Sequence, residues 1–200
     1  MIYSNYIKVY ADKLMGVALG ILLLPLLILI CILLLLTQGN PIYFVQMRSG
    51  RHQIKFKLYK FRTLISASSG DLGMKSKTFT FFGYFMRKFG FDELPQLFNI
   101  IKGEMSFIGP RPMPVEYDSK YNIVQLNRFK EKQGITGWAQ VHGRNDISWV
   151  RRFELDLWYV NNVSLFVDIK IIWMTFFQII RSVFSKDKKQ IEMPIFTGSN

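Results

Sequence analysis

Two adjacent carboxylates, Asp92 and Glu93, stand out because the chain around them is strongly basic. Before Asp92 the sequence holds only two other acidic residues, against twelve lysines and arginines. Pro95 follows closely, and proline is tolerated in the first turn of a helix because its missing N–H is not needed there. The pattern predicts that a helix begins near Asp92, with this aspartate at or beside the N-cap.

Two roles are open to this acidic pair. Asp is among the best N-cap residues and Glu is favourable in the first turn, so the pair could simply start the helix. The same position also suits phosphate chemistry, because a helix start offers free N–H groups and partial positive charge to an anion. A carboxylate there could attack phosphorus and form an acyl-phosphate, while its neighbour helps to hold Mg²⁺ beside the substrate phosphates.

Cations that could neutralise the charge of phosphoryl transfer flank the pair. They are Lys60, Arg62, Arg87, Lys88, Arg111 and Arg144. Most lysines and arginines are solvated surface residues, but the two prolines of "GPRP" fix the backbone around Arg111 and reduce the cost of ordering it. His52 and His142 have no paired ligand spacing, so we assign them no metal.

The composition favours a membrane-surface protein with anionic partners. The formal charge is +12 over 200 residues, yet half of the residues are hydrophobic, which argues against a nucleic-acid binder. The single cysteine, Cys31, excludes an internal disulfide and a zinc site built on cysteines. The chain has no P-loop and no Rossmann glycine pattern.

A 23-residue run without charge, Leu14 to Leu36, predicts a membrane segment. As one helix it would be about 35 Å long, enough for a bilayer core of about 30 Å. Pro25 lies in the middle and favours a kink, which would leave two arms of about 16 Å each. Lysines and arginines flank both ends, which favours both ends on the cytoplasmic side. From these residues alone, a spanning helix and a re-entrant hairpin both remain open.

The rest of the chain is predicted to be mixed, with more helix than strand. Alternating apolar and basic residues around Ser49-Gly50 predict a β-hairpin that exposes Lys55 and Lys57. Residues 66–77 are expected to form a flexible loop, and 109–114 an extended one because of their prolines. The expected helices are 79–89, 92–102, 118–131, 148–161 and 165–184, the last with a polar stripe of Asp168, Thr175, Gln178 and Ser182.

Several blocks in order resemble the bacterial sugar transferases that act as polyprenyl-phosphate phosphoglycosyl transferases. The blocks are "KFRTL", "FDELPQLFNIIKGEMSFIGPRP", "GITGWAQVHGRN" and "SLFVDIKIIWMT", and the resemblance covers roughly residues 5–184. The chain is most similar to the small, monotopic form, and within it to the branch that transfers N,N′-diacetylbacillosamine phosphate. The resemblance implies a re-entrant helix-break-helix at Pro25, although Leu24 replaces the serine usual before that proline.

The resemblance implies transfer of a sugar-1-phosphate from a UDP-sugar to undecaprenyl phosphate, with release of UMP. Asp92 would be the nucleophile that carries the phosphosugar covalently, and Glu93 its partner in the Mg²⁺ site. Cations at family positions would bind phosphate and nucleotide, namely Lys60, Arg62, Arg87, Arg111 and Arg144. An N-acetylated sugar is favoured, and downstream glycosyltransferases are possible partners.

The sequence therefore predicts a mostly helical α+β monotopic membrane protein with a re-entrant helix-break-helix, a small β-hairpin and interfacial amphipathic helices. Residues 1–40 would form the membrane hairpin, 41–185 the catalytic domain on the cytoplasmic face of the bacterial inner membrane, and 186–200 a polar, frayed tail. The competing hypothesis is a non-enzymatic basic adaptor on the membrane. Sequence does not identify the sugar, the oligomeric state or the glycoconjugate pathway.

Overall fold

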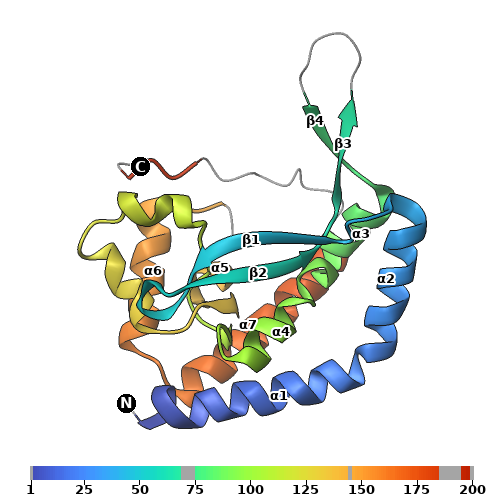
Figure 1. The fold of residues 1–200 in the computed structure, drawn as a ribbon. Helices are drawn as coiled ribbons and strands as arrows, with labels where there is room; N and C mark the ends of the chain where they lie inside the picture. Colours follow the sequence, from blue (N-terminus) through green and yellow to red (C-terminus); the bar gives the residue numbers. More distant parts are fainter. Residues whose placement is uncertain (1, 69–74, 144–145, 185–194, 199–200) are drawn as a thin grey trace.

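In the computed structural model of the protein, the apolar N-terminal segment forms two helices that meet at a sharp bend (Figure 1). A short π-helical turn, Tyr3–Ile7, leads into α1 (Lys8–Leu22), and α2 spans Leu24–Gln38. The two arms bend by 62° at Leu23, and Pro25 lies in the first turn of α2, where its missing N–H needs no partner. The predicted break near Pro25 is confirmed.

The length and polarity of these helices bear on membrane insertion. In the part of the chain that the structure describes, residues 2–68, 75–143, 146–184 and 195–198, no single helix is both long and apolar enough to cross a bilayer. The bent pair passes that test when its two arms are taken together, by length and composition only.

The predicted β-hairpin is confirmed. β1 (Tyr43–Ser49) pairs antiparallel with β2 (Lys55–Phe61), with Tyr43 opposite Phe61 and Ser49 opposite Lys55. Phe56 and Leu58 turn inward and are buried, while Lys55 and Lys57 on the other face are exposed. This alternation is what a two-stranded ribbon with one packed face requires.

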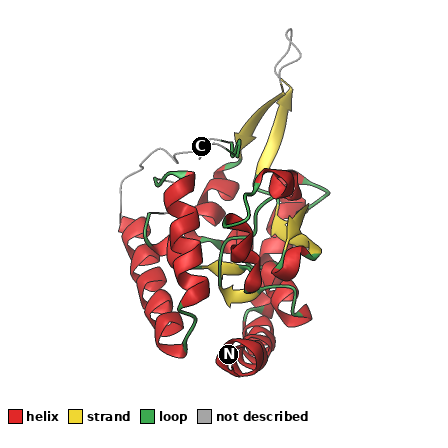
Figure 2. Ribbon diagram, turned by 90° about the vertical axis from the view of Figure 1, so that its left-hand side faces the viewer, coloured by secondary structure: helices red, strands yellow, loops and turns green. Residues whose placement is uncertain are grey.

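The predicted loop over 66–77 is too long. β3 (Leu64–Ser68) and β4 (Lys75–Phe79) form a second antiparallel hairpin that projects from the body in both views (Figures 1 and 2). Residues 69–74 lie outside the described residues. The Ser- and Gly-rich composition predicted a loop, but a ladder forms from backbone groups and tolerates small polar side chains.

The acidic pair lies between two short helices. α3 (Phe81–Phe89) begins at Thr80, whose hydroxyl accepts a hydrogen bond from the Gly83 N–H at 2.8 Å, and ends at Gly90 in the left-handed region (φ 73°). A single 3₁₀ turn, Phe91–Glu93, follows, and α4 spans Gln96–Lys102 with Gly103 as its left-handed C-cap.

The predicted helix start at Asp92 is therefore wrong by four residues. Pro95 is the N-cap of α4, and Asp92 lies in the middle of the 3₁₀ turn without capping it. The turn is closed by backbone bonds from the N–H groups of Glu93 and Leu94 to the carbonyls of Gly90 and Phe91. Those bonds hold the turn without the Asp92 carboxylate.

The predicted helix over 118–131 is also wrong. After β5 (Ser106–Ile108) the "GPRPMP" segment has no regular structure, as its prolines predict. Two 3₁₀ stretches follow, Val115–Lys120 and Gln125–Lys130, and then β6 (Gly134–Thr136), parallel to β5. Asn122 separates them, because its side-chain oxygen accepts from the N–H groups of Val124 and Gln125.

The remaining helices form the back of the molecule (Figure 1). They are α5 (Trp138–Val141), α6 (Trp149–Asn161), which Ser148 caps, and α7 (Leu165–Phe184). The last two agree closely with the predicted ranges 148–161 and 165–184.

The polar stripe of α7 faces the protein. Asp168 is 3% exposed, Thr175 bonds Thr136, and Gln178 donates to the Val141 carbonyl, while the side chain of Ser182 lies outside the described residues. The opposite arc is apolar and exposed, with the residues Leu165, Phe166, Ile169, Ile172, Trp173, Phe176 and Phe177.

The predicted frayed tail is contradicted at one residue. Phe196 is fully buried and packs against Tyr121, Trp149 and Phe153, with ring centroids 5.2–5.6 Å apart. Lys120 holds the same segment by donating to the Phe196 carbonyl at 2.9 Å. A lone aromatic residue in a polar tail gives too little signal for sequence to predict such an anchor.

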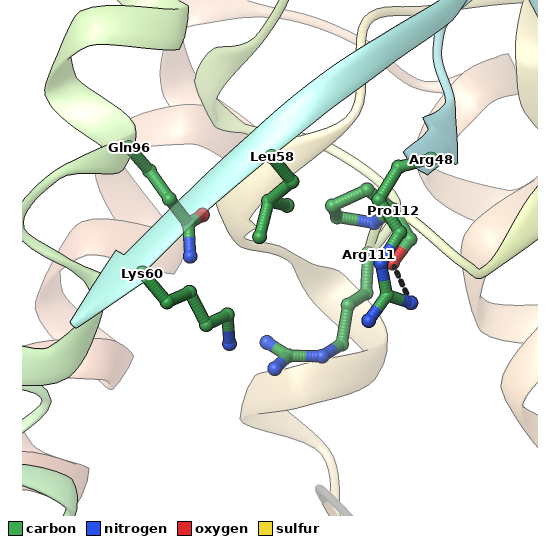
Figure 3. A pocket seen from close by; sticks show the side chains of 6 residues that line it. All are labelled: Arg48, Leu58, Lys60, Gln96, Arg111 and Pro112. Atoms are coloured by element: carbon green, nitrogen blue, oxygen red, sulfur yellow. Dashed lines mark hydrogen bonds between the residues drawn. The ribbon is translucent and has the colours of Figure 1, made fainter. Parts of the chain in front are cut away.

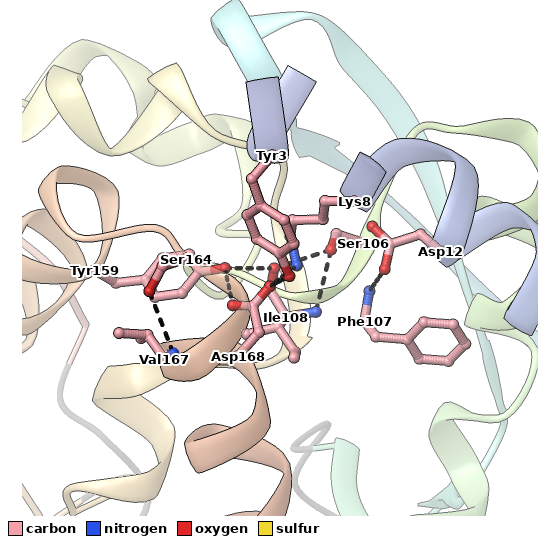
Figure 4. Close-up of polar contacts among 10 residues, drawn as sticks. All are labelled: Tyr3, Lys8, Asp12, Ser106, Phe107, Ile108, Tyr159, Ser164, Val167 and Asp168. Carbon is pink, nitrogen blue, oxygen red and sulfur yellow. Dashed lines mark hydrogen bonds and ion pairs between the residues drawn. The ribbon is translucent and has the colours of Figure 1, made fainter. Parts of the chain in front are cut away.

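A buried ionic cluster joins the first helix to the last (Figure 4). One carboxylate oxygen of Asp168 accepts from the Lys8 ammonium and the Tyr3 hydroxyl, each at 2.7 Å. Its other oxygen accepts from the Tyr159 hydroxyl, also at 2.7 Å. Because these partners come from the N-terminal segment, α6 and α7, the cluster fixes the apolar N-terminal helices on the rest of the protein.

Replacing Asp168 by Asn should destabilise the protein strongly. The substitution leaves the Lys8 ammonium buried without its counter-charge, a loss of about 3–5 kcal/mol. We expect the thermal unfolding midpoint in nanodiscs to fall by about 10 °C. The control is Glu154→Gln, which breaks an exposed ion pair with Arg151 and should cost at most about 1 kcal/mol. Equal effects of the two substitutions would contradict a stabilising role for the cluster.

Candidate active site

Glu93 joins three segments that are far apart in sequence. Its Oε1 atom lies 2.5 Å from the Lys60 ammonium on β2 and 3.0 Å from the Arg111 guanidinium in the "GPRP" loop. Three of the predicted site residues are therefore brought into direct contact. The ion pairs are only partly open to water, since the Glu93 side chain is 19% exposed and the Lys60 side chain 18%.

The two cations set the protonation state of Glu93. Burial alone would raise the pKa of this carboxyl, but the charges of Arg111 and Lys60, and their hydrogen bonds, lower it to about 2. Burial also lowers the pKa of the Lys60 ammonium, although Glu93 opposes that shift. At neutral pH Glu93 is therefore a fixed anion that has two cationic partners.

The pKa of the Asp92 carboxyl is shifted in the opposite direction to that of Glu93. Asp92 is 7% exposed, and burial together with the neighbouring charge of Glu93 raises the pKa of its carboxyl. Lys60, Arg87 and Arg111 oppose the shift, so all three lie close enough to act on it electrostatically. A carboxylate with a raised pKa is the more basic and more nucleophilic of the pair.

Two further arginines hold the loop that carries Arg111. Arg128 donates to the Arg111 carbonyl at 2.7 Å, and Arg48 donates to the next carbonyl, that of Pro112, at 3.2 Å. Arg128 is itself fixed by Asp156 at 2.8 Å, and the side chains of both are almost completely buried. The backbone on both sides of Arg111 is thus secured by distant elements.

The sequence alone did not predict that Arg128, Asp156 and Arg48 support the loop that carries Arg111. Arg128 and Asp156 lie in stretches predicted as surface helices, where a charged residue gives no sign of burial. Arg48 is one of the cations that follow the apolar run, a position that predicts no role in the site. Arg48 lies opposite the buried Phe56 in the β1–β2 ladder. Strand alternation could therefore have predicted that Arg48 lies on the packed face of the hairpin.

The remaining predicted residues lie elsewhere. Arg62 donates to the carbonyls of Gln38 and Gly39, so it holds the end of α2. Arg144 lies outside the described residues. His142 is exposed, with its Nδ1 atom 2.8 Å from the Trp138 carbonyl, beside an open cavity of about 440 Å³ between α5 and α6.

The donor set can be compared with what Mg²⁺ requires. Across the described ranges, no three His, Cys, Asp or Glu side chains come together in a way that could hold a metal ion by themselves. Mg²⁺ commonly takes only one or two carboxylates and completes its shell with water and substrate phosphates. The adjacent carboxylates of Asp92 and Glu93 fit that second arrangement, in which the substrate brings the remaining ligands.

A small cavity opens beside the two cations of Glu93 (Figure 3). Its volume is about 10 Å³, and Arg48, Leu58, Lys60, Gln96, Arg111 and Pro112 line it. This space is close to the minimum that one water molecule or one oxygen atom needs.

Comparison with known proteins agrees with the sequence blocks. Residues 3–182 match the family model described as "Bacterial sugar transferase". The chain is 44% identical over 163 residues to the "Uncharacterized sugar transferase EpsL" of Bacillus subtilis, covering 80% of this chain and 81% of that protein.

Longer relatives match through part of their length. Identity is 36% to the "UDP-galactose-lipid carrier transferase" of Erwinia amylovora, covering 86% of this chain and 40% of that protein. It is 34% to the "UDP-glucose:undecaprenyl-phosphate glucose-1-phosphate transferase" of Xanthomonas campestris pv. campestris, covering 86% and 38%. The chain thus spans about two fifths of these longer relatives.

The charge state of Glu93 should be visible in stability at low pH. Its pKa is about 2 in the folded protein and 4.5 ordinarily, so the ionised form favours folding above pH 4.5 by about 3 kcal/mol. This contribution is lost as the pH falls from 4.5 towards 2. We expect wild type to unfold at a higher temperature than Glu93→Gln at pH 6, and the gap to narrow by pH 3.5. A gap that does not change with pH would show that the ion pairs do not stabilise the fold.

Proposed function

The chain belongs to the bacterial sugar transferase family, and on that premise we propose that it transfers a sugar-1-phosphate from a UDP-sugar to undecaprenyl phosphate and releases UMP. The observation that carries the proposal is the acidic pair. A buried Asp92 lies beside Glu93, which forms ion pairs with Lys60 and Arg111, two side chains of the kind that bind phosphate. The transferases named for glucose and galactose among its relatives support the same class of reaction.

Asp92 is the proposed nucleophile. Its carboxylate oxygen attacks the sugar-linked phosphorus, an O–P bond forms, and the bond to the UMP oxygen breaks with the electron pair leaving on UMP. An oxygen of undecaprenyl phosphate then attacks the same phosphorus. The aspartyl O–P bond breaks, the Asp92 carboxylate is restored, and the lipid diphosphosugar leaves.

The difference between the two carboxyls supports this assignment. Glu93 shares its charge with Lys60 and Arg111, which reduces its basicity, whereas burial and the charge of Glu93 raise the pKa of Asp92. The charges of Lys60, Arg87 and Arg111 oppose that shift in the pKa of Asp92 and so favour its ionised form. The nearby cations also suit the charge that phosphoryl transfer concentrates on oxygen.

The other predicted roles extend this proposal. Lys60, Arg87 and Arg111 would bind the diphosphate, and Arg144 the nucleotide side of the donor. The contacts of Arg62 favour a role in fixing the end of α2 over direct phosphate binding. Mg²⁺ would be held by Asp92 and Glu93, and when bound it supplies positive charge to the diphosphate oxygens.

A membrane location suits both the acceptor and the surface. The exposed aromatic and aliphatic arc of α7, together with the bent α1–α2 pair, gives the molecule apolar faces that a lipid surface would cover. The surplus of lysine and arginine suits anionic headgroups on the cytoplasmic side of the bacterial inner membrane. We therefore propose monotopic attachment there, with a re-entrant α1–α2 pair.

The sugar is the least specified part of the donor. Relatives are named for glucose and for galactose, whereas the sequence blocks favoured an N-acetylated amino sugar. One or two pocket side chains can change such a preference. We propose an N-acetylated UDP-sugar as the first candidate, followed by the glucose and galactose nucleotides.

The test of the reaction is UMP release from a panel of these UDP-sugars with undecaprenyl phosphate and Mg²⁺ in nanodiscs. We expect release with one donor and a fall of at least about 1,000-fold in Asp92→Asn, because an amide is a far weaker nucleophile. A radiolabelled phosphosugar should stay on wild type, but not on the variant, when acceptor is omitted.

The folded state of the variant is checked by its thermal unfolding midpoint. A near-normal rate in Asp92→Asn would exclude the aspartyl intermediate. No release with any donor, from folded wild type in lipid, would favour the competing adaptor hypothesis, which also expects binding to acidic vesicles that UDP-sugars do not affect.

Metal removal tests the Mg²⁺ proposal. Chelation by EDTA should stop UMP release and added Mg²⁺ should restore it, since Mg²⁺ would supply part of the positive charge that balances the donor diphosphate. Glu93→Gln should lower the rate at least about 100-fold and raise the Mg²⁺ concentration for half-maximal rate. Glu154→Gln, an exposed change in the same formal charge, serves as control. Full activity in EDTA would refute the requirement for metal.

A further inference from the structure

The cavity beside Glu93 is lined by positive charge. Of its six lining residues, Arg48, Lys60 and Arg111 are cationic, and among these described residues none is a carboxylate. Figure 3 shows Lys60 and Arg111 pointing toward one another from opposite sides, with Arg48 beside Arg111. Glu93 is the carboxylate in contact with Lys60 and Arg111, and Asp92 and Glu116 act electrostatically on the same group of cations.

Arg48 has a rigid place in this wall. Its two terminal nitrogens donate to the Gln46 side-chain oxygen at 2.7 Å and to the Pro112 carbonyl at 3.2 Å. Both acceptors are neutral, so they orient the guanidinium without cancelling its charge. The side chain is thus held in one orientation before any substrate binds.

One donor of Arg48 is left without a partner. The Nε–H is buried and has no hydrogen-bond acceptor among the described residues. A buried donor of this kind costs about 1–3 kcal/mol, and its usual explanation is a water or an ion that belongs in the site. Burial and the charge of Arg111 also lower the pKa of Arg48 to about 10, so the group is still a cation at neutral pH.

We propose that Arg48 is a further phosphate-binding cation of the active site, and that with Lys60 and Arg111 it receives an oxygen of the donor diphosphate. The cavity has room for about one oxygen atom, and a phosphate oxygen carries the negative charge that the wall lacks. It adjoins the Glu93 ion pairs, so a phosphate held there lies beside the acidic pair. The inference rests on the proposed function.

A different role for Arg48 makes a distinct prediction. Because Arg48 donates to the Pro112 carbonyl, it could act only by holding the loop that places Arg111. In that case its replacement would have no effect once the Arg111 side chain is removed. A direct contact would instead give a loss that adds to the loss at Arg111.

The experiment is a double-mutant cycle on binding of UDP, in the Asp92→Asn background so that no covalent transfer takes place. Arg48→Gln and Arg111→Gln are made singly and together, and Kd values are measured by calorimetry in nanodiscs. Each lost charge-assisted bond should weaken UDP binding about 10-fold, and the double variant about 100-fold. Binding of uridine, which carries no phosphate, should not change.

Two matched variants distinguish a specific loss of UDP binding from a general effect of lost charge or misfolding. Arg51→Gln removes a charge at the end of the same hairpin, where Arg51 bonds the Lys130 carbonyl and Asn5, and it should leave UDP affinity unchanged. Arg48→Lys keeps the charge but loses the forked geometry, so it should bind UDP with an affinity between wild type and Arg48→Gln. If Arg48→Gln does not fold, the cycle is run with Arg48→Lys.

Two outcomes overturn the inference. One is an unchanged UDP affinity in Arg48→Gln. The other is a loss that disappears in the Arg111→Gln background, which would make Arg48 a positioning residue only. The proposed function fails separately, because a wild type that binds UDP but releases no UMP would refute the transferase while the cycle still decides the role of Arg48.

Discussion

The contact of one carboxylate with two cations assembles the site. Glu93 lies on a short turn, Lys60 on a β-strand and Arg111 on a loop between prolines, and these segments share no sequence proximity. Without Glu93, the Lys60 ammonium and the Arg111 guanidinium would face each other across a partly buried space, where like charges repel strongly. The ion pairs therefore help to fix where β2, the 3₁₀ turn and the "GPRP" loop meet, together with the hydrogen bonds of Arg128 and Arg48 to the loop carbonyls.

The same contact gives two neighbouring carboxyls different chemistry. Glu93 is paired with cations, so its pKa is low, and its negative charge then adds to burial in raising the pKa of Asp92. Pairs of titratable groups whose environments shift their pKa values apart are typical of catalytic sites. A helix cap would need neither the cations nor the burial, and the N-cap of α4 is in fact Pro95.

The sequence was sufficient where local pattern decides the structure. Strand alternation predicted the β1–β2 hairpin, periodicity predicted α6 and α7, and Pro25 predicted the bend. Prediction from sequence failed where side-chain contacts determine the local structure or the burial of a residue. Asn122 breaks the helix predicted over 118–131, and Arg128 is buried there only because Asp156 of α6 neutralises it. In the site, Lys60 and Arg111 were found because motifs contain them, whereas Arg48, in no such motif, became evident only from its contact with Pro112.

The buried side of α7 explains how a surface can be apolar without destabilising the fold. Asp168, Thr175 and Gln178 bond inward, so the polar stripe of the helix is satisfied by protein contacts. The opposite face carries the exposed aromatic residues that we propose to contact lipid. Because Lys8 of α1 binds the same Asp168, both apolar surfaces are fixed on one body. In the proposed attachment to the membrane, this connection would hold the acidic pair at a fixed position relative to the lipid surface, as the proposed transfer to a lipid phosphate requires.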